Sequence, residues 1–239
     1  MSLLYYECIV PVNIFTKISP VEKAYRNIGY PFIFLLVLVI FGFFKTYFGQ
    51  FPHFGVQTTT IVHLHVLFLM LWILLLIVQP MLIRYHKYAA HRLIGRFTYV
   101  LVPMIILSFI GMMSKQIHET SPKTIPEALN SLYLPITDTL LFSTFYTLAI
   151  INKRNVALHM RYIIMTGFVF IDASLIRSLA IWFHVDFFYA ALISISFVDL
   201  IIISLTYFDK INGRPYKPFL ISLILFMIVQ TGIVILRYH

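Results

Sequence analysis

The side chains best suited to chemistry lie in two short basic segments of the sequence. One reads His-Arg-Leu-Ile-Gly-Arg over residues 91–96, and the other reads His-Met-Arg over residues 159–161. Two inward imidazoles in an apolar, aromatic-rich slot are enough to bind haem b, and guanidinium groups can pair with its propionates. The alternative is that these residues only snorkel to the membrane interface and set the orientation of the chain. The candidate haem-binding residues are His91, His159, Arg92, Arg96 and Arg161, with His65 and His184 as a second histidine pair near the outer face.

Helix geometry orients the polar residues of the apolar run Ile61–Ile83. His65, Trp72 and Gln79 are spaced by seven residues, so they drift by only about 20° per step and share one face. His63 is two residues from His65 and points to nearly the opposite side. Because Gln79 marks the polar face, His65 is predicted to be the interior histidine of the two.

Further ionisable residues fall inside later apolar runs, where a charge costs about 2.5–3.5 kcal/mol on insertion scales and needs a partner or a watery cavity. Distances along the helices place Arg177 and Asp138 in the outer leaflet, which predicts a buried ion pair inside a polar chamber. Asp172 and Asp199 fall near mid-membrane, where they can share a proton or bond to Ser and Thr neighbours. The alternative is that these groups only hold the helices together, with no ligand. The predicted buried polar network is Asp138, Arg177, Asp172, Asp199 and Gln79.

The composition indicates a membrane protein. Hydrophobic residues make up 60% of the 239 and charged residues 11%, whereas soluble domains carry roughly 25% charged residues. The apolar runs are continuous, which favours a helical bundle over a β-barrel whose strands alternate. The net charge of +9 does not indicate nucleic-acid binding, because basic residues gather beside the cytoplasmic ends of membrane helices. The single cysteine, Cys8, excludes an internal disulfide and a multi-cysteine metal cluster.

The fold expected is all-α, a polytopic bundle of seven transmembrane helices. We expect an interfacial N-terminal segment over residues 1–27 and a transmembrane domain over residues 28–239. The N-terminal segment is not a signal peptide, because its basic residues follow its short apolar stretch. A polar loop, Ser114–Tyr133, is predicted to be the longest connection. The predicted spans are 28–48, 61–83, 94–113, 134–152, 162–184, 187–208 and 217–236.

The distribution of Lys and Arg predicts the orientation. Thirteen of the eighteen lie on one side of the predicted spans, four lie on the other, and Arg177 lies within a span. Basic residues are retained on the cytoplasmic side, so we expect the N-terminus in the cytoplasm and the C-terminus outside.

The two basic segments resemble a bacterial integral-membrane family known as a domain of unknown function. That family combines a histidine in an early span, an H-R-x-x-G-R corner, an H-R-x-W-M corner and a later arginine. The chain departs from this pattern at Met160 and near Ile164. The first corner is also similar to one in haem A synthase, and the layout of histidines is similar to cytochrome b561-type proteins. These resemblances imply a bacterial cytoplasmic membrane, haem b, and a quinone or other redox partner. The matching positions are His65, His91, Arg92, Gly95, Arg96, His159, Arg161 and Arg177.

Four functions remain open from the sequence. The first is a haem-binding redox or haem-handling protein, with the lipid bilayer as its surroundings. The second is a zinc hydrolase that uses His63 or His65 with His184 and Asp138, although no H-x-x-x-H pair supports it. The third is a transporter of a small solute or protons that uses the buried polar network. The fourth is a non-catalytic accessory or assembly subunit, so whether the chain is an enzyme stays open.

Overall fold

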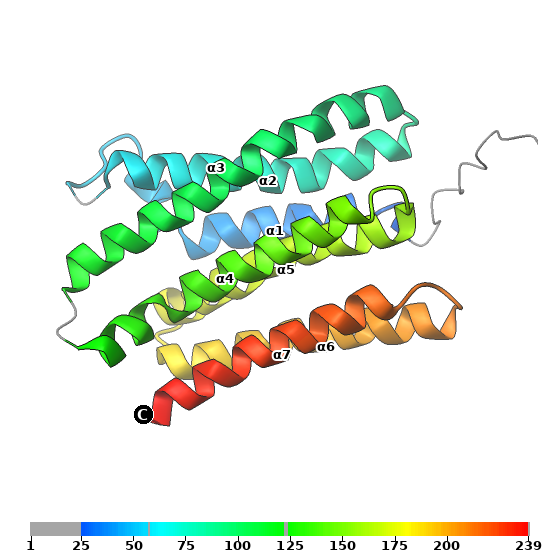
Figure 1. The fold of residues 1–239 in the computed structure, drawn as a ribbon. Helices are drawn as coiled ribbons and strands as arrows, with labels where there is room; N and C mark the ends of the chain where they lie inside the picture. Colours follow the sequence, from blue (N-terminus) through cyan, green and yellow to red (C-terminus); the bar gives the residue numbers. More distant parts are fainter. Residues whose placement is uncertain (1–24, 57, 122–123, 239) are drawn as a thin grey trace, which may run out of the picture.

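The computed structural model describes residues 25–56, 58–121 and 124–238 as a helical bundle (Figure 1). The predicted interfacial segment 1–27 lies outside these residues except for its last three. A short 3₁₀ segment, η2 (Phe48–Gln50), lies in the connection between α1 and α2. The α-helices are α1 (Gly29–Gly42), α2 (Thr60–Arg84), α3 (Tyr88–Thr120), α4 (Ile125–Ile151), α5 (Val156–Trp182), α6 (Phe187–Ile211) and α7 (Lys217–Tyr238).

The helices form three layers around α5 (Figure 1). Helices α2 and α3 make one outer layer, α1, α4 and α5 lie in the middle, and α6 and α7 make the other outer layer. Helix α5 packs against α1, α4 and α6, and also contacts α2 and α7. Its apolar stretch is 61% buried, compared with 22–33% in the other long apolar helices. A helix that is apolar all round and surrounded by others forms the centre of the core.

Among the described residues, five helices are long and apolar enough to cross a membrane: α2, α3, α5, α6 and the Ser131–Ile151 part of α4. Helix α1 and the Lys217–Ile233 part of α7 are shorter apolar helices. Large apolar side chains cover the outside of the bundle, for example Phe34, which is 78% exposed. An apolar exterior of this kind is suited to lipid rather than water. The protein is therefore an all-helical membrane bundle.

Small residues bring α1 close to α5. A Cβ atom placed on Gly42 would lie 2.6 Å from the backbone oxygen of Ser174 and 3.1 Å from Oγ of Ser178. Membrane helices approach this closely where one of them carries a residue with no side chain. This contact fixes the end of α1 beside the part of α5 that carries Asp172 and Arg177.

The predicted loop Ser114–Tyr133 is mostly helical, so the third and fourth predicted spans were too short. Helix α3 continues to Thr120 and α4 begins at Ile125. The hydroxyl of Thr124 accepts a hydrogen bond from the Glu127 backbone N–H at 3.3 Å. The sequence Thr-Ile-Pro-Glu over residues 124–127 is a helix-start pattern, in which a proline in the first turn costs nothing. Pro126 therefore fits the beginning of a helix and does not indicate a loop.

Candidate functional site

A cavity of about 870 Å³ lies at the end of the bundle where α2 begins and α5 ends. We call it the chamber. Its walls are mainly apolar, and Phe43, Ile73, Phe109 and Phe170 are among them. Polar side chains enter it from the α1–α2 connection and from α2, α3, α4, α5 and the start of α6. They include Tyr47, His65, Gln116, Asp138, Asp172, Arg177 and Asp186.

His65 faces the chamber and His63 does not, which is the orientation that helix spacing predicts. His65 Nδ1 lies 3.0 Å from Oγ of Ser108, whose own hydroxyl donates to the Ile105 carbonyl at 2.7 Å. The hydroxyl proton is therefore used, so Nδ1–H of His65 donates to Ser108 and Nε2 keeps its lone pair. His63 Nδ1 instead shares a 2.8 Å hydrogen bond with the hydroxyl of Tyr47. Partial burial raises the pKa of Tyr47, so its phenol stays neutral near pH 7.

Two carboxyl groups lie close together at the chamber wall. Oδ1 of Asp172 accepts a short hydrogen bond from the hydroxyl of Ser194 on α6. Asp138 on α4 is near enough to Asp172 for their charges to repel. Asp199 is not among the chamber-lining residues, and Nε2 of Gln230 on α7 donates to it at 3.2 Å. Asp199 is also near enough to Asp172 for their charges to repel. Asp172 therefore lies between the two other acids, and its bond to Ser194 is of the kind that the sequence predicted.

Arg177 enters the chamber without the predicted ion pair to Asp138. Among the residues that the structure describes, no carboxylate oxygen lies within 4.0 Å of its guanidinium. The guanidinium lies over the ring of Phe43, 4.6 Å from the centroid. The face of an aromatic ring attracts a cation, and this contact turns Arg177 toward α1 and away from α4. The side chain is exposed to the chamber.

The predicted outer histidine pair is not formed. Helix α5 ends at Trp182, two residues before His184, and His184 has a positive φ of 54° on the exposed surface. It is not among the chamber-lining residues, whereas His65 is. The zinc set of His63 or His65, His184 and Asp138 is therefore not assembled. Within the described ranges, no three His, Cys, Asp or Glu side chains are grouped to hold a metal ion.

The chamber is thus where His65, Asp138, Asp172 and Arg177 come together from α2, α4 and α5. Comparisons with models of known protein families, with curated proteins and with solved structures found no match. A cavity with apolar walls and a few charged groups has the chemistry of a site for a small organic ligand. Its guanidinium can hold an anionic group, and its carboxylates can hold a cation or a proton.

A second polar cluster lies at the opposite, basic end of the bundle and contains Gln79, His91 and His159. With its amide oriented to match its neighbours, Gln79 donates to Nδ1 and the carbonyl of His91 and accepts from the Gly95 N–H at 3.1 Å. Nδ1–H of His159 donates to the Ala149 carbonyl at 2.8 Å, and His159 is near enough to His91 for their charges to repel. The prediction that Gln79 belongs to the buried polar network with Asp138 and Arg177 is therefore wrong.

Gln79 lies outside the chamber because it is at a different depth from His65. Fourteen residues separate the two and place them about 21 Å apart along α2. Residues that share a helix face do not need to share a level in the membrane. Of the arginines in the two basic segments, Arg92 and Arg96 are exposed at this end.

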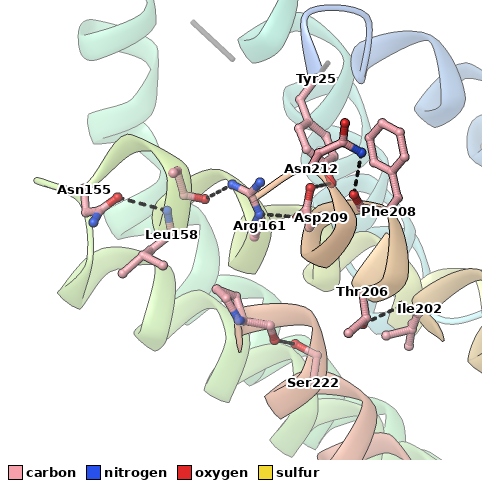
Figure 2. Close-up of polar contacts among 12 residues, drawn as sticks. Tyr25, Asn155, Leu158, Arg161, Ile202, Thr206, Phe208, Asp209, Asn212 and Ser222 are labelled. Atoms are coloured by element: carbon pink, nitrogen blue, oxygen red, sulfur yellow. Dashed lines mark hydrogen bonds and ion pairs between the residues drawn. The ribbon is translucent and has the colours of Figure 1, made fainter. Parts of the chain in front are cut away.

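Arg161 has a different role from the propionate partner that the sequence suggested. Its side chain and that of Asp209 are both 0% exposed, and Nε of Arg161 lies 2.7 Å from Oδ2 of Asp209 (Figure 2). The hydroxyl of Tyr25 donates to Oδ1 of Asp209 at 2.9 Å. The guanidinium also lies 4.9 Å from the ring of Tyr25 and 5.8 Å from that of Phe219. An arginine enclosed in this way cannot reach a cofactor at the surface.

Asp209 was missed because the sixth span was predicted to stop at residue 208, which left this acid in a loop. Helix α6 in fact continues to Ile211, and α5 begins at Val156, capped by the side chain of Asn155 (Figure 2). The cap signal at Asn155 would have placed Arg161 more than one turn inside α5. No comparable signal in the sequence identifies Asp209 as its partner.

Proposed function

We propose that this protein is a membrane transporter that takes a small organic solute into the chamber. The volume of about 870 Å³ falls in the range of roughly 300–1,000 Å³ typical of ligand pockets. Ionisable residues that face a cavity inside a membrane protein commonly mark the path of a solute or ion. The observation that carries the proposal is Arg177, which is exposed inside the bundle and has no acidic partner among the described residues.

The orientation that we propose places the chamber toward the outside of a bacterial cytoplasmic membrane, with seven crossings and a cytoplasmic N-terminus. The excess of Lys and Arg at the opposite end supports this orientation. Helix α1 has 14 residues and is about 21 Å long, so it needs flanking residues to cross a hydrocarbon core of about 30 Å.

Closure at the cytoplasmic end supports transport over simple solute capture outside. A carrier that opens to one side must be sealed toward the other. The Arg161–Asp209 pair, covered by Tyr25 and Phe219, lies at the end away from the chamber. An ion pair can separate and become hydrated, so it is a closure that can reopen.

Access to the chamber can be tested with a single reactive cysteine. In a Cys8→Ser background, Ala173→Cys lines the chamber, and a membrane-impermeant maleimide should label it from the outside of oriented vesicles. Labelling from the cytoplasmic side should be at least tenfold slower, which corresponds to a free-energy difference of about 1.4 kcal/mol in access to the cysteine. Ala149→Cys is the matched control, because Ala149 is 0% exposed and should stay unlabelled from either side. Protection of Ala173→Cys from both sides would rule out an outward-open chamber.

A second candidate, haem b at the basic end, is favoured by the state of His159. Because Nδ1–H of His159 is held by the Ala149 carbonyl, its Nε2 lone pair is free to ligate a metal. The proximity of His91 would supply a second imidazole. The fit is incomplete, because the amide of Gln79 donates to Nδ1 of His91 and so places the proton of His91 on Nε2. Haem binding would require Gln79 to turn over, and only Arg92 and Arg96 remain for the propionates.

The absorbance spectrum of the purified protein tests this second candidate. A bound haem b would give a Soret band that shifts on reduction and is lost in His159→Phe. A protein that stays colourless after expression with added haem precursor would exclude it. That result would leave the transporter proposal, as well as the resemblance to the uncharacterised bacterial family, unaffected.

A further inference from the structure

The chamber holds acidic and basic side chains that do not pair with each other. Asp172 and Arg177 are five residues apart on α5, which places them about 7.5 Å apart along the axis and about 140° apart around it. Asp138 joins Asp172 from α4. In the described part of the chain, neither carboxylate has a Lys or Arg nitrogen within 4.0 Å. The chamber therefore presents a cationic wall and a wall of carboxyl groups.

Neighbouring side chains hold these groups apart. The guanidinium of Arg177 lies over Phe43 of α1, and the carboxylate of Asp172 is bound by Ser194 of α6. These contacts pull the two groups toward different helices. Ionisable groups without a partner are costly in a membrane interior, so a single ligand with two opposite charges would relieve the cost at both walls.

We infer that the solute is a zwitterion whose carboxylate binds Arg177 and whose ammonium group binds between Asp138 and Asp172. The inference rests on the proposed function. Its apolar middle would lie against the aromatic wall formed by Phe109 and Phe170. The separation of the two walls suits an ω-amino acid, in which several carbons separate the charges, better than an α-amino acid. His65 offers the lone pair of Nε2 as a further acceptor in the same chamber.

The test compares three matched probes on the full-length protein purified in detergent. The probes are 5-aminovalerate, valerate and pentylamine, and shorter and longer ω-amino acids extend the series. Affinity is read from the rise in the thermal unfolding temperature with probe concentration. We expect the best ω-amino acid to bind about 10- to 100-fold more tightly than the acid or the amine of the same length, the effect of one lost charged hydrogen bond.

Charge-neutral variants assign each end of the probe. Asp138→Asn should abolish the preference for 5-aminovalerate over valerate, and Arg177→Gln should abolish its preference over pentylamine. Asp199→Asn is the matched control, because this acid acts on Asp172 from outside the chamber lining. It should change the three affinities by less than either chamber variant does. The unfolding temperature of each unliganded variant shows whether it is folded.

Two results would overturn the inference. One is binding of valerate as tight as that of any ω-amino acid, with no effect of Asp138→Asn. The other is a folded protein that none of the series stabilises. In both cases, labelling of Ala173→Cys still decides separately whether the chamber is open to solutes.

Discussion

Replacing Asp209 with leucine will lower the free energy of unfolding by about 3–5 kcal/mol. The substitution leaves the guanidinium of Arg161, which is 0% exposed, buried without its carboxylate. It also removes the acceptor of the Tyr25 hydroxyl. The loss is measured by unfolding the purified protein with denaturing detergent.

The double variant Arg161→Leu/Asp209→Leu is the informative comparison. Removing both charges leaves neither member of the pair buried without the other, so the double variant should be more stable than Asp209→Leu alone. Asp199→Leu is the control for losing an acid elsewhere on α6, where a single 3.2 Å hydrogen bond from Gln230 is lost. If Asp209→Leu destabilised no more than Asp199→Leu, the pair would not be a central contact.

The same pair links four segments at one end of the bundle. It joins α5 to α6, and the rings of Tyr25 and Phe219 bring in the residues before α1 and the start of α7. Helices α5 and α6 are otherwise connected at the opposite end, by residues 183–186. The pair therefore joins α5 to α6 at the end opposite to their chain connection.

Helix faces could be predicted from the sequence because they depend on local geometry alone. The spacing of His63 and His65 puts their rings on opposite sides of the helix, and the face shared by His65 and Gln79 indicates which ring points inward. The helical membrane bundle could be predicted for the same reason, because an apolar run is recognised as a membrane helix from its own length and composition. The ends of the helices are predicted less accurately from apolar runs, because they depend on cap residues such as Thr124 and Asn155.

Partners across the bundle could not be predicted, because they depend on how helices pack. Arg177 and Asp138 both line the chamber, yet the guanidinium lies over the ring of Phe43. Arg161 was placed at the interface, yet it pairs with an acid 48 positions further along the chain. Spacing within one helix says nothing about the reach of a side chain toward the next.

Trp72 is expected to be the seal between the chamber and the basic end. It is 2% exposed, and its indole N–H donates to the hydroxyl of Thr166 at 3.2 Å. Its ring also meets Phe142 and Tyr146 edge to face, at 5.2 and 5.7 Å. Trp72→Ala will cost about 3–5 kcal/mol of unfolding free energy, because a large cavity replaces the ring. Denaturing-detergent unfolding gives the value.

Trp72→Phe separates the ring from its hydrogen bond. Phenylalanine keeps most of the apolar contact but removes the indole N–H that donates to the Thr166 hydroxyl. That hydroxyl still donates to the Ile163 carbonyl at 2.6 Å. The cost in unfolding free energy should be about 1–3 kcal/mol, clearly below that of alanine.

Because Ile73, the next residue on α2, lines the chamber, the cavity left by alanine would extend the chamber toward Gln79 and His91. Trp72→Ala vesicles should then leak small ions, whereas Trp72→Phe vesicles should remain tight. Equal tightness of the two variants would show that the layers below Trp72, including the Arg161–Asp209 pair, close the bundle without it.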